Sequence, residues 1–178
     1  MDYTTVPYTT HLGEALDLLK DPGLLLVGAG KDGRPNAMTI GWGTVGIIWA
    51  KPIFAVLVRY SRFTFQVLEE SDSFTVCVPA PEHYDAVDFC GTKSGRDYDK
   101  FSECNLTALP SSTISAPGIA GCPLIYECKI VHTNDVVPEN LDANIKAGSY
   151  AQGDYHRIYY GEILALRTLP NAVDLLQT

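Results

Sequence analysis

Short apolar runs separated by turn-forming residues recur along most of this chain. Leu24–Ala29 is one such run, Gly30–Arg34 is a turn with an Asp-Gly hairpin signal, and Asn36–Trp42 is the expected returning strand. The same pattern predicts further strands at Val45–Trp49, Ile53–Val58, Ser73–Val78, Leu124–His132 and Arg157–Arg167. Most of the connections are short, which favours antiparallel pairing.

Helical periodicity is confined to short segments. His11–Lys20 is a predicted helix that Thr10 can cap and that Asp21-Pro22-Gly23 ends; Leu12, Leu16 and Leu19 lie near one face of it. Further short helical or turn-rich segments are predicted at Thr64–Glu70, with Ser61 or Arg62 near its N-cap, and at Pro81–Cys90 and Arg96–Phe101. Because strands outnumber helices and do not alternate with long ones, the predicted fold class is mainly β with α (α+β), a barrel or mixed antiparallel sheet.

Composition narrows the possible partners. The 178 residues suit one domain spanning 1–178, with 46% hydrophobic and 19% charged residues. A net charge of −8 argues against a nucleic-acid partner. Five cysteines, an odd number without C-x-x-C spacing, favour reduced thiols in the cytoplasm over a disulfide framework or a zinc site.

Neither a targeting segment nor a metal site is expected. The N-terminus lacks the basic and apolar regions of a signal peptide. The most apolar window, Ile40–Val58, is interrupted by Lys51-Pro52, so we expect buried strands and no membrane span. His11, His83 and His132 are scattered, which predicts no metal site.

Two glycine-rich segments match parts of nucleotide-binding motifs without meeting their requirements. The stretch 28–33 fits G-x-G-x-x-G, but Pro35 and a predicted strand stand where that motif needs a helix, and no acid occurs between Asp32 and Glu69. We interpret it as a hairpin turn. Gly91-Thr92-Lys93-Ser94 lacks the adjacent Gly-Lys pair of a Walker A motif, and we reject that motif.

Asn36–Trp42 combines a strand with short polar side chains. Free backbone N–H groups, together with Asn36 and Thr39, suit the polar edge of a flavin ring, and Trp42 suits a flat apolar wall. An amphipathic strand with a core tryptophan would have the same pattern, so this segment alone leaves both interpretations open.

Two further segments suit an anion. The stretch 59–64 ends a strand and opens a helix, and its two arginines and hydroxyls favour phosphate, although an N-cap flanked by solvated arginines is the alternative. The stretch 89–95, followed by Asp99-Lys100-Phe101, supplies two glycines for close backbone approach and donors at Ser94 and Lys100, with an ordinary surface loop as the alternative.

The order of these segments resembles the flavin reductase-like domain family, in the branch that contains flavoredoxins. The shared elements are N-x-M-T-x-x-W, then R-x-S-R-x-T, then F-C-G-x-x-S-G with D-K-F, then C-P-L-I-Y-E-C at 122–128 and G-D-Y-H-R-I-Y-Y-G-E-I at 153–163. The resemblance covers about Pro22 to Leu166. It implies a Greek-key-like, FMN-binding split β-barrel with short peripheral helices, non-covalent FMN, and a homodimer with FMN near the subunit interface.

The resemblance also implies roles for individual residues. Asn36, Met38 and Thr39 would lie along the isoalloxazine, with Ala37 and Trp42 among the cofactor-binding residues. The phosphate would be held by Arg59, Ser61, Arg62 and Thr64. The ribityl and phosphate side would be lined by Cys90, Gly91, Ser94, Gly95 and Lys100, with Cys90 interpreted as a quiet loop cysteine rather than a reactive thiol.

His156 is the candidate catalytic residue, expected to approach the flavin or the nicotinamide from the late hairpin. Many family members with strong reductase activity have G-D-H there, whereas Tyr155 separates Asp154 from His156. Since a one-residue shift in a strand turns a side chain to the other face, a half-buried sheet histidine is the alternative.

The expected activity is that of an NAD(P)H-dependent flavin oxidoreductase. Electrons would pass from NAD(P)H or a redox protein partner through bound FMN to an acceptor, which requires no protein nucleophile or acid–base dyad. The alternatives are a flavin store or sensor, an electron carrier without NAD(P)H turnover, and a split-barrel relative that binds haem or pyridoxal phosphate.

Overall fold

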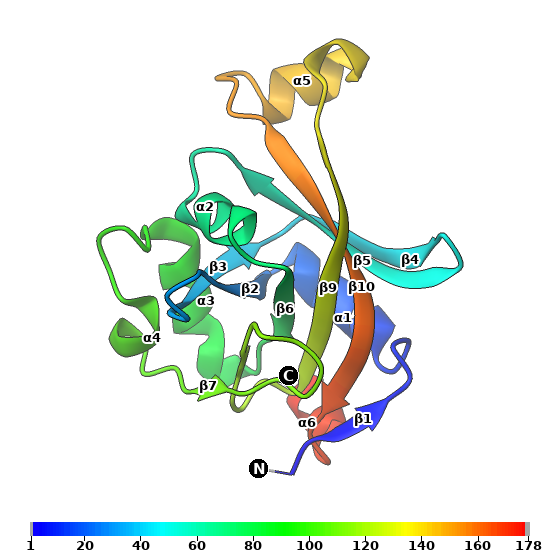
Figure 1. Cartoon of the computed structure of the whole chain (residues 1–178), viewed down its shortest axis with the longest axis vertical. Helices are drawn as coiled ribbons and strands as arrows, with labels where there is room; N and C mark the ends of the chain where they lie inside the picture. The colour runs from blue at the N-terminus through cyan, green and yellow to red at the C-terminus, as the bar shows by residue number, and fades with distance from the viewer. Residues whose placement is uncertain (1, 177–178) are drawn as a thin grey trace.

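An eight-stranded antiparallel sheet forms the centre of the molecule (Figure 1). The computed structural model describes residues 2–176. Along the sheet the order is β3-β2-β6-β9-β10-β5-β4, with β1 paired to β10, so the sheet runs from an edge at β3 to an edge at β4 and is open. Its strands are β1 (Thr4–Val6), β2 (Leu24–Ala29), β3 (Pro35–Ile40), β4 (Gly43–Ile48), β5 (Lys51–Arg59), β6 (Ser73–Val78), β9 (Leu124–Asp135) and β10 (His156–Thr168).

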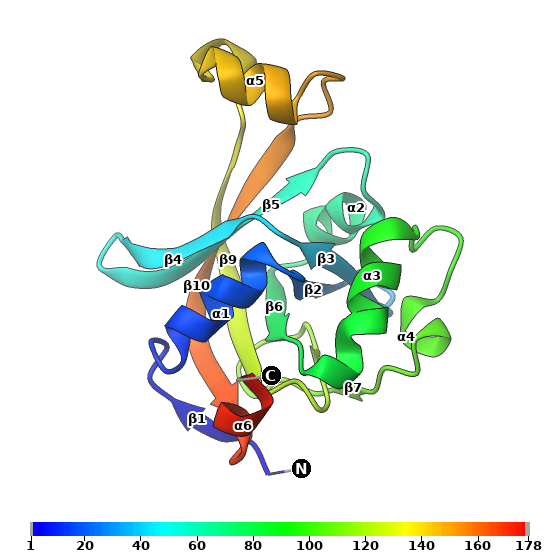
Figure 2. The same cartoon turned by 180° about the vertical axis from the view of Figure 1, so that it is seen from behind.

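Short helices cover both sides of this sheet. They are α1 (Leu12–Lys20), α2 (Phe63–Glu69), α3 (Tyr84–Thr92), α4 (Lys100–Glu103), α5 (Ala143–Ser149) and α6 (Ala172–Leu176), with 3-10 turns at Pro81–His83 and Pro138–Asn140. The strands β7 (Ala108–Leu109) and β8 (Gly118–Ile119) form a small second sheet. Figures 1 and 2 show α3 and α4 beside β2 and β3, away from α1. None of the helices within residues 2–176 has the length and apolarity that crossing a bilayer requires.

Two apolar cores meet at β2. Leu24 and Leu26 join the core that also contains α1, whereas Leu25 and Val27 join the core formed with α3. Because successive side chains of a strand point to opposite faces, a strand buried on both faces must be apolar throughout. This explains why Leu24–Ala29 is an unbroken apolar run, and it places α3 against the same part of the sheet as β3.

The ends of β9 and β10 continue beyond the sheet and carry α5, which stands apart from the rest of the fold in Figure 1. Asp142 caps α5 by accepting hydrogen bonds from the amides of Asn144 and Ile145. We name residues 136–155 the α5 arm. The arm returns the chain to His156, which pairs with Arg59 at the end of β5.

All seven predicted strands are confirmed, and β2 and β6 begin and end where expected. The first helix differs in detail, because His11 and not Thr10 occupies its N-cap position, and Leu16 is 40% exposed while Ala15 and Leu19 are buried. The β4–β5 turn lies at Trp49-Ala50, just before the expected Lys51-Pro52. The segment 96–101, predicted to be helical or turn-rich, is a turn that leads into the short helix α4. Sequence patterns missed β1, β7, β8, α5 and α6.

Candidate functional site

The open edge of β3 is where most of the predicted site residues gather. The carbonyl of Ala37 accepts a hydrogen bond from Lys100 Nζ at 2.9 Å, so the backbone groups of Ala37 point away from β2. The direction of the backbone N–H and C=O groups alternates from residue to residue along a strand. The backbone groups of Thr39, two residues after Ala37, therefore face the open edge as well. The edge thus presents backbone N–H groups to whatever lies beside β3.

A hollow of about 170 Å³ lies at the end of this edge, and we name it the Trp42 hollow. It is lined by Met38, Thr39, Ile40, Gly41, Trp42, Leu57, Arg59, Arg62 and His156. The indole of Trp42 is 43% exposed, and its ring centroid lies 5.1 Å from that of the His156 imidazole. The hollow therefore combines an aromatic wall, a strand edge and cationic side chains.

A second hollow of about 150 Å³ adjoins the first, and we name it the Ser94 hollow. It is lined by Met38, Ser61, Arg62, Phe63, Thr64, Cys90, Lys93, Ser94, Arg96 and Lys100. Met38 and Arg62 line both hollows, so the two are neighbours along β3. Cations and hydroxyls dominate this lining and no carboxylate belongs to it, which favours an anionic group.

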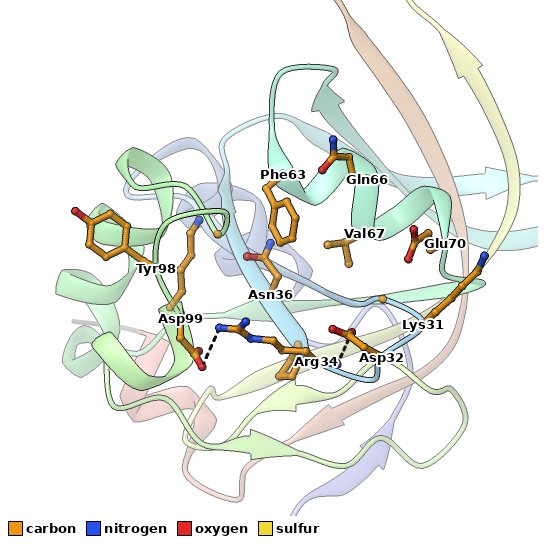
Figure 3. A pocket seen from close by; sticks show the side chains of 14 residues that line it. Lys31, Asp32, Arg34, Asn36, Phe63, Gln66, Val67, Glu70, Tyr98 and Asp99 are labelled. Atoms are coloured by element: carbon orange, nitrogen blue, oxygen red, sulfur yellow. Dashed lines mark hydrogen bonds and ion pairs between the residues drawn. The ribbon is translucent and has the colours of Figure 1, made fainter.

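A third hollow, of about 370 Å³, is larger than the first two, and we name it the Tyr98 hollow (Figure 3). It is lined by Gly30, Lys31, Asp32, Arg34, Pro35, Asn36, Phe63, Gln66, Val67, Glu70, Gly95, Tyr98, Asp99 and Lys100. Phe63 and Lys100 also line the Ser94 hollow. A Cβ at Gly95 would come within 2.1 Å of Asn36 Oδ1, so a glycine is required where this loop crosses β3.

Several predicted ligand-binding side chains are engaged within the protein itself. Thr39 Oγ1 donates to the carbonyl of Val87 in α3, and Asn36 Nδ2 donates to Thr64 Oγ1 at 2.9 Å. The Ala37 side chain is buried in the core shared with α3. These three side chains are therefore not free to bind a ligand, and β3 offers a ligand mainly its backbone groups.

The loop after α3 is packed tightly onto β3. Lys100 is buried, and its Nζ donates to the carbonyls of both Ala37 and Cys90 at 2.9 Å; burial lowers the pKa of this amine. A Cβ at Gly91 would meet the Thr39 side chain at 3.3 Å. Burial raises the pKa of Cys90 to about 12, so the thiol stays protonated at neutral pH, in keeping with a quiet cysteine.

Arg59 and Ser61 face the α5 arm. The Arg59 guanidinium donates to the carbonyls of Asp154 at 2.7 Å and Ser149 at 2.9 Å. The Ser61 amide and hydroxyl both donate to the Asp154 carboxylate, at 3.2 and 2.7 Å. A carboxylate therefore occupies the groups of Ser61 that sequence reasoning assigned to a phosphate, whereas Arg62 remains in both hollows with one long contact, 3.4 Å, to the Gly91 carbonyl.

His156 is buried and turned into the Trp42 hollow. The extra residue before it is accommodated by a turn with left-handed backbone at Gly153 and Asp154 (φ 74° and 53°), while Tyr155 stacks on Tyr150. The Tyr150 hydroxyl lies 2.8 Å from His156 Nδ1. Burial, followed by the charge of Arg59, lowers the pKa of His156 to about 4, so the imidazole is neutral at physiological pH.

Sequence reasoning missed several residues of this site. Leu57 lines the Trp42 hollow, while Lys93 and Arg96 line the Ser94 hollow. Lys93 and Arg96 lie within and just after the motif at 89–95, so their charge was the available signal. Asp154 reaches the site through the α5 arm, whose path the sequence pattern did not predict.

The protein is thus an open antiparallel sheet that carries an aromatic hollow and a cationic hollow side by side. The sequence model of one protein family, the flavin reductase like domain, matches residues 22–176 of this chain. This chain belongs to the flavin reductase-like domain family. Its incompletely closed sheet with short helices confirms the expected split barrel.

The chain is similar to several individual proteins. An uncharacterized protein of Archaeoglobus fulgidus is 32% identical over 98 residues, and the match spans 55% of this chain and 55% of that relative. A flavoredoxin from Methanosarcina acetivorans is 25% identical with a TM-score of 0.66, over 84% of this chain and 69% of that one. The NADH:FAD oxidoreductase of Streptomyces globisporus, 19% identical, shares the fold with a TM-score of 0.63 over 96% and 90% of the two chains.

Proposed function

We propose that this chain is an FMN-binding oxidoreductase of the flavin reductase type, which accepts electrons from NAD(P)H or a redox protein partner. The observation that carries the proposal is the pairing of the Trp42 and Ser94 hollows along the edge of β3. FMN joins a flat ring with a polar edge to a chain ending in phosphate. An aromatic, strand-edged hollow beside a cationic one matches both halves of that molecule.

The residues present fit FMN as follows. The ring would lie in the Trp42 hollow, against Met38 and Trp42, with its polar edge toward the backbone N–H of Thr39. The phosphate would lie in the Ser94 hollow, near Arg62, Lys93 and Ser94, and Arg62 would reach both parts. Compared with the assignment from sequence, the proposal keeps Arg62 and Ser94 near the phosphate, gives up Arg59 and Ser61, and adds Lys93 and Arg96.

Bound FMN supplies the redox chemistry, and the protein orients it and excludes water. His156 lies beside the proposed ring position as a neutral imidazole, and its Nε2 could form a hydrogen bond with the ring. NADH as donor is supported by the name of the Streptomyces neighbour, an NADH:FAD oxidoreductase. The nicotinamide would stack on the face of the ring that is turned away from Met38 and Trp42.

Oxidation of NADH and NADPH by FMN-loaded protein tests this function. An oxidoreductase of this type should consume one of the two nucleotides with a free flavin or oxygen as acceptor, and heat-denatured protein with the same FMN should not. Protein that retains FMN, is reduced by dithionite and ignores both nucleotides would contradict the NAD(P)H-dependent activity and favour a carrier, store or sensor.

Further features of the proposal concern assembly. We propose one domain over residues 1–178 and a homodimer with FMN near the subunit interface. Support for self-association comes from the β4–β5 hairpin, where Ile47 and Trp49 are 61% and 58% exposed, since exposed apolar patches mark interaction sites. A Trp49→Glu variant that remains a dimer in light scattering would contradict this interface.

A cytoplasmic location stays a prediction from the cysteine content.

Use of FAD as well as FMN is a second candidate function, favoured by the Tyr98 hollow. This hollow adjoins the proposed phosphate position at Phe63 and Lys100, and FMN alone would leave it outside the bound molecule. Phe63 offers an aromatic face for adenine (Figure 3). AMP should then compete with FAD but not with FMN in a binding titration. An equal effect of AMP on both flavins, or none on FAD, would contradict it.

A further inference from the structure

We propose that Tyr150 is a positioning residue that fixes the tautomer and charge state of His156, so that Nε2–H is presented to the Trp42 hollow. This inference rests on the proposed function, which places the cofactor ring in that hollow. Tyr150 belongs to the α5 arm and His156 begins β10, so the contact also couples the arm to the site.

The contact between the two side chains is short and shielded from water. Tyr150 Oη and His156 Nδ1 are 2.8 Å apart, the residues are 5% and 7% exposed, and their rings meet edge to face with centroids 5.5 Å apart. A hydrogen bond in such surroundings is strengthened by the low local dielectric. It occupies one of the two ring nitrogens of His156.

The second nitrogen, Nε2, is left for the hollow. Within residues 2–176 the one hydrogen bond of the His156 ring is that to Tyr150, and His156 itself lines the Trp42 hollow. Among the same residues, Tyr126 Oη is the one fully buried side-chain polar atom without a hydrogen-bond partner. His156 Nε2 has no partner either, and it is therefore not fully buried. Nε2 is therefore accessible from the hollow, beside the exposed Trp42.

The direction of the Tyr150 hydrogen bond decides which nitrogen carries the proton. A phenol is a stronger acid than a neutral imidazole, and an imidazole nitrogen without a proton is the better acceptor. Tyr150 therefore donates its O–H to Nδ1, and the ring proton of His156 resides on Nε2. In this state His156 is a neutral hydrogen-bond donor toward the hollow.

The charged groups around His156 favour the same neutral state. Arg59 faces it from β5, Arg62 from the segment before α2, and Asp154 from the turn before β10. Burial and the two cations disfavour imidazolium, and Asp154 opposes them. The Asp154 carboxylate is itself hydrogen-bonded to the amide and hydroxyl of Ser61.

Tyr150 is held rigidly enough to position its neighbour. The Arg59 guanidinium carbon lies 5.2 Å from the centroid of the Tyr150 ring, while the same guanidinium holds the carbonyls of Ser149 and Asp154 on either side of that residue along the arm. Tyr155 stacks on the ring with centroids 4.9 Å apart. The arm, Arg59 and Tyr150 thus form one support for His156.

The test compares Tyr150→Phe with Tyr155→Phe, a matched control that removes a neighbouring hydroxyl with no hydrogen bond to His156 within residues 2–176. Nitrogen NMR of the histidine ring across a pH titration should show the Nε2–H tautomer in the wild-type chain and in Tyr155→Phe. Tyr150→Phe should populate both tautomers, and the pKa of His156 should rise by about one unit, because the neutral form loses a hydrogen bond. The reduction potential of bound FMN should shift in Tyr150→Phe alone.

An unchanged tautomer and pKa in Tyr150→Phe, or equal changes in both variants, would overturn the assignment. The NMR measurement needs no FMN. A wild-type chain that fails to bind FMN would overturn the proposed function, while the tautomer and pKa would still decide the role of Tyr150.

Discussion

Lys100 Nζ lies 2.9 Å from the carbonyl oxygen of Ala37, and this contact joins α4 to the open edge of β3. The same ammonium donates to the Cys90 carbonyl at the end of α3. One buried cation thus holds together the strand edge and the loop that line the proposed FMN site. A charge-assisted hydrogen bond to each carbonyl offsets the cost of burying the amine.

Replacing Lys100 with methionine should therefore loosen the site while keeping the volume of the side chain. Two buried carbonyls would lose their partner, which should lower the free energy of unfolding by roughly 1–3 kcal/mol. Urea denaturation measures this effect, and Lys93→Met, at an exposed lysine in the same loop, is the control. A Lys100→Met protein as stable as wild type would show that the ammonium contributes little.

Arg62 and Arg59 should differ in their effect on FMN. Arg62→Ala should weaken FMN binding by about 10–100-fold with little loss of stability, since a charge-assisted contact contributes about 1.5–3 kcal/mol. Arg59→Ala should mainly destabilise the α5 arm, because its two carbonyl contacts disappear. Fluorescence titration and thermal unfolding separate the two effects.

The control for these variants is Arg34→Ala, which removes an exposed arginine paired with Asp99 outside both hollows. If Arg59→Ala weakened FMN binding as much as Arg62→Ala, while the arm stayed folded, the sequence-based phosphate role of Arg59 would be restored.

Glu127 should be important for stability although it lies far from the site. Its fully buried carboxylate accepts hydrogen bonds from the backbone and hydroxyls of Ser112 and Thr113 and from Arg167. Burial opposes the charge, but these bonds outweigh it and lower the pKa of Glu127. Glu127→Gln should lower the unfolding free energy by roughly 2–4 kcal/mol, against almost none for the exposed Glu139→Gln. Denaturant titration of both proteins checks this, and equal stabilities would refute it.

Acidification should destabilise the protein in two ranges. The pKa of His156 falls from 6.5 to about 4 on folding, so the unfolded chain takes up a proton that the folded chain refuses. Stability from this group is full above about pH 6.5 and declines toward pH 4, by up to about 3 kcal/mol. Glu127 has a lowered pKa, so its contribution is lost below the ordinary range of a glutamate.

Unfolding of His156→Asn between pH 7 and 4 isolates the first contribution. This variant should lose most of the decline in stability between pH 6.5 and 4, and a decline as steep as that of wild type would contradict the assignment to His156.

The sheet could be predicted from sequence because its signal is local. Leu24–Ala29 and Ser73–Val78 are apolar runs bounded by turn residues, and both became strands with the expected ends. The α5 arm could not be predicted in this way. Its helix lacks buried residues, so nothing in the hydrophobic pattern marks it.

The candidate site was foreseen as a set of motifs, but not as a set of contacts. The positions of Met38, Arg62 and Ser94 around two hollows agree with the order of the motifs. The partner of a polar side chain depends on segments far away in sequence. Ser61 therefore gave no sign that Asp154, 93 residues later, would accept its hydrogen bonds.

Binding of FMN tests the central claim most directly. Purified chain, stripped of any bound flavin, would be titrated with FMN while flavin fluorescence and the visible absorption spectrum are recorded, with Arg62→Ala beside it. The account predicts saturable binding with one FMN per chain, a perturbed flavin spectrum from the Trp42 hollow, and a clear loss of affinity in Arg62→Ala. Absence of saturable FMN binding by a folded chain would contradict it.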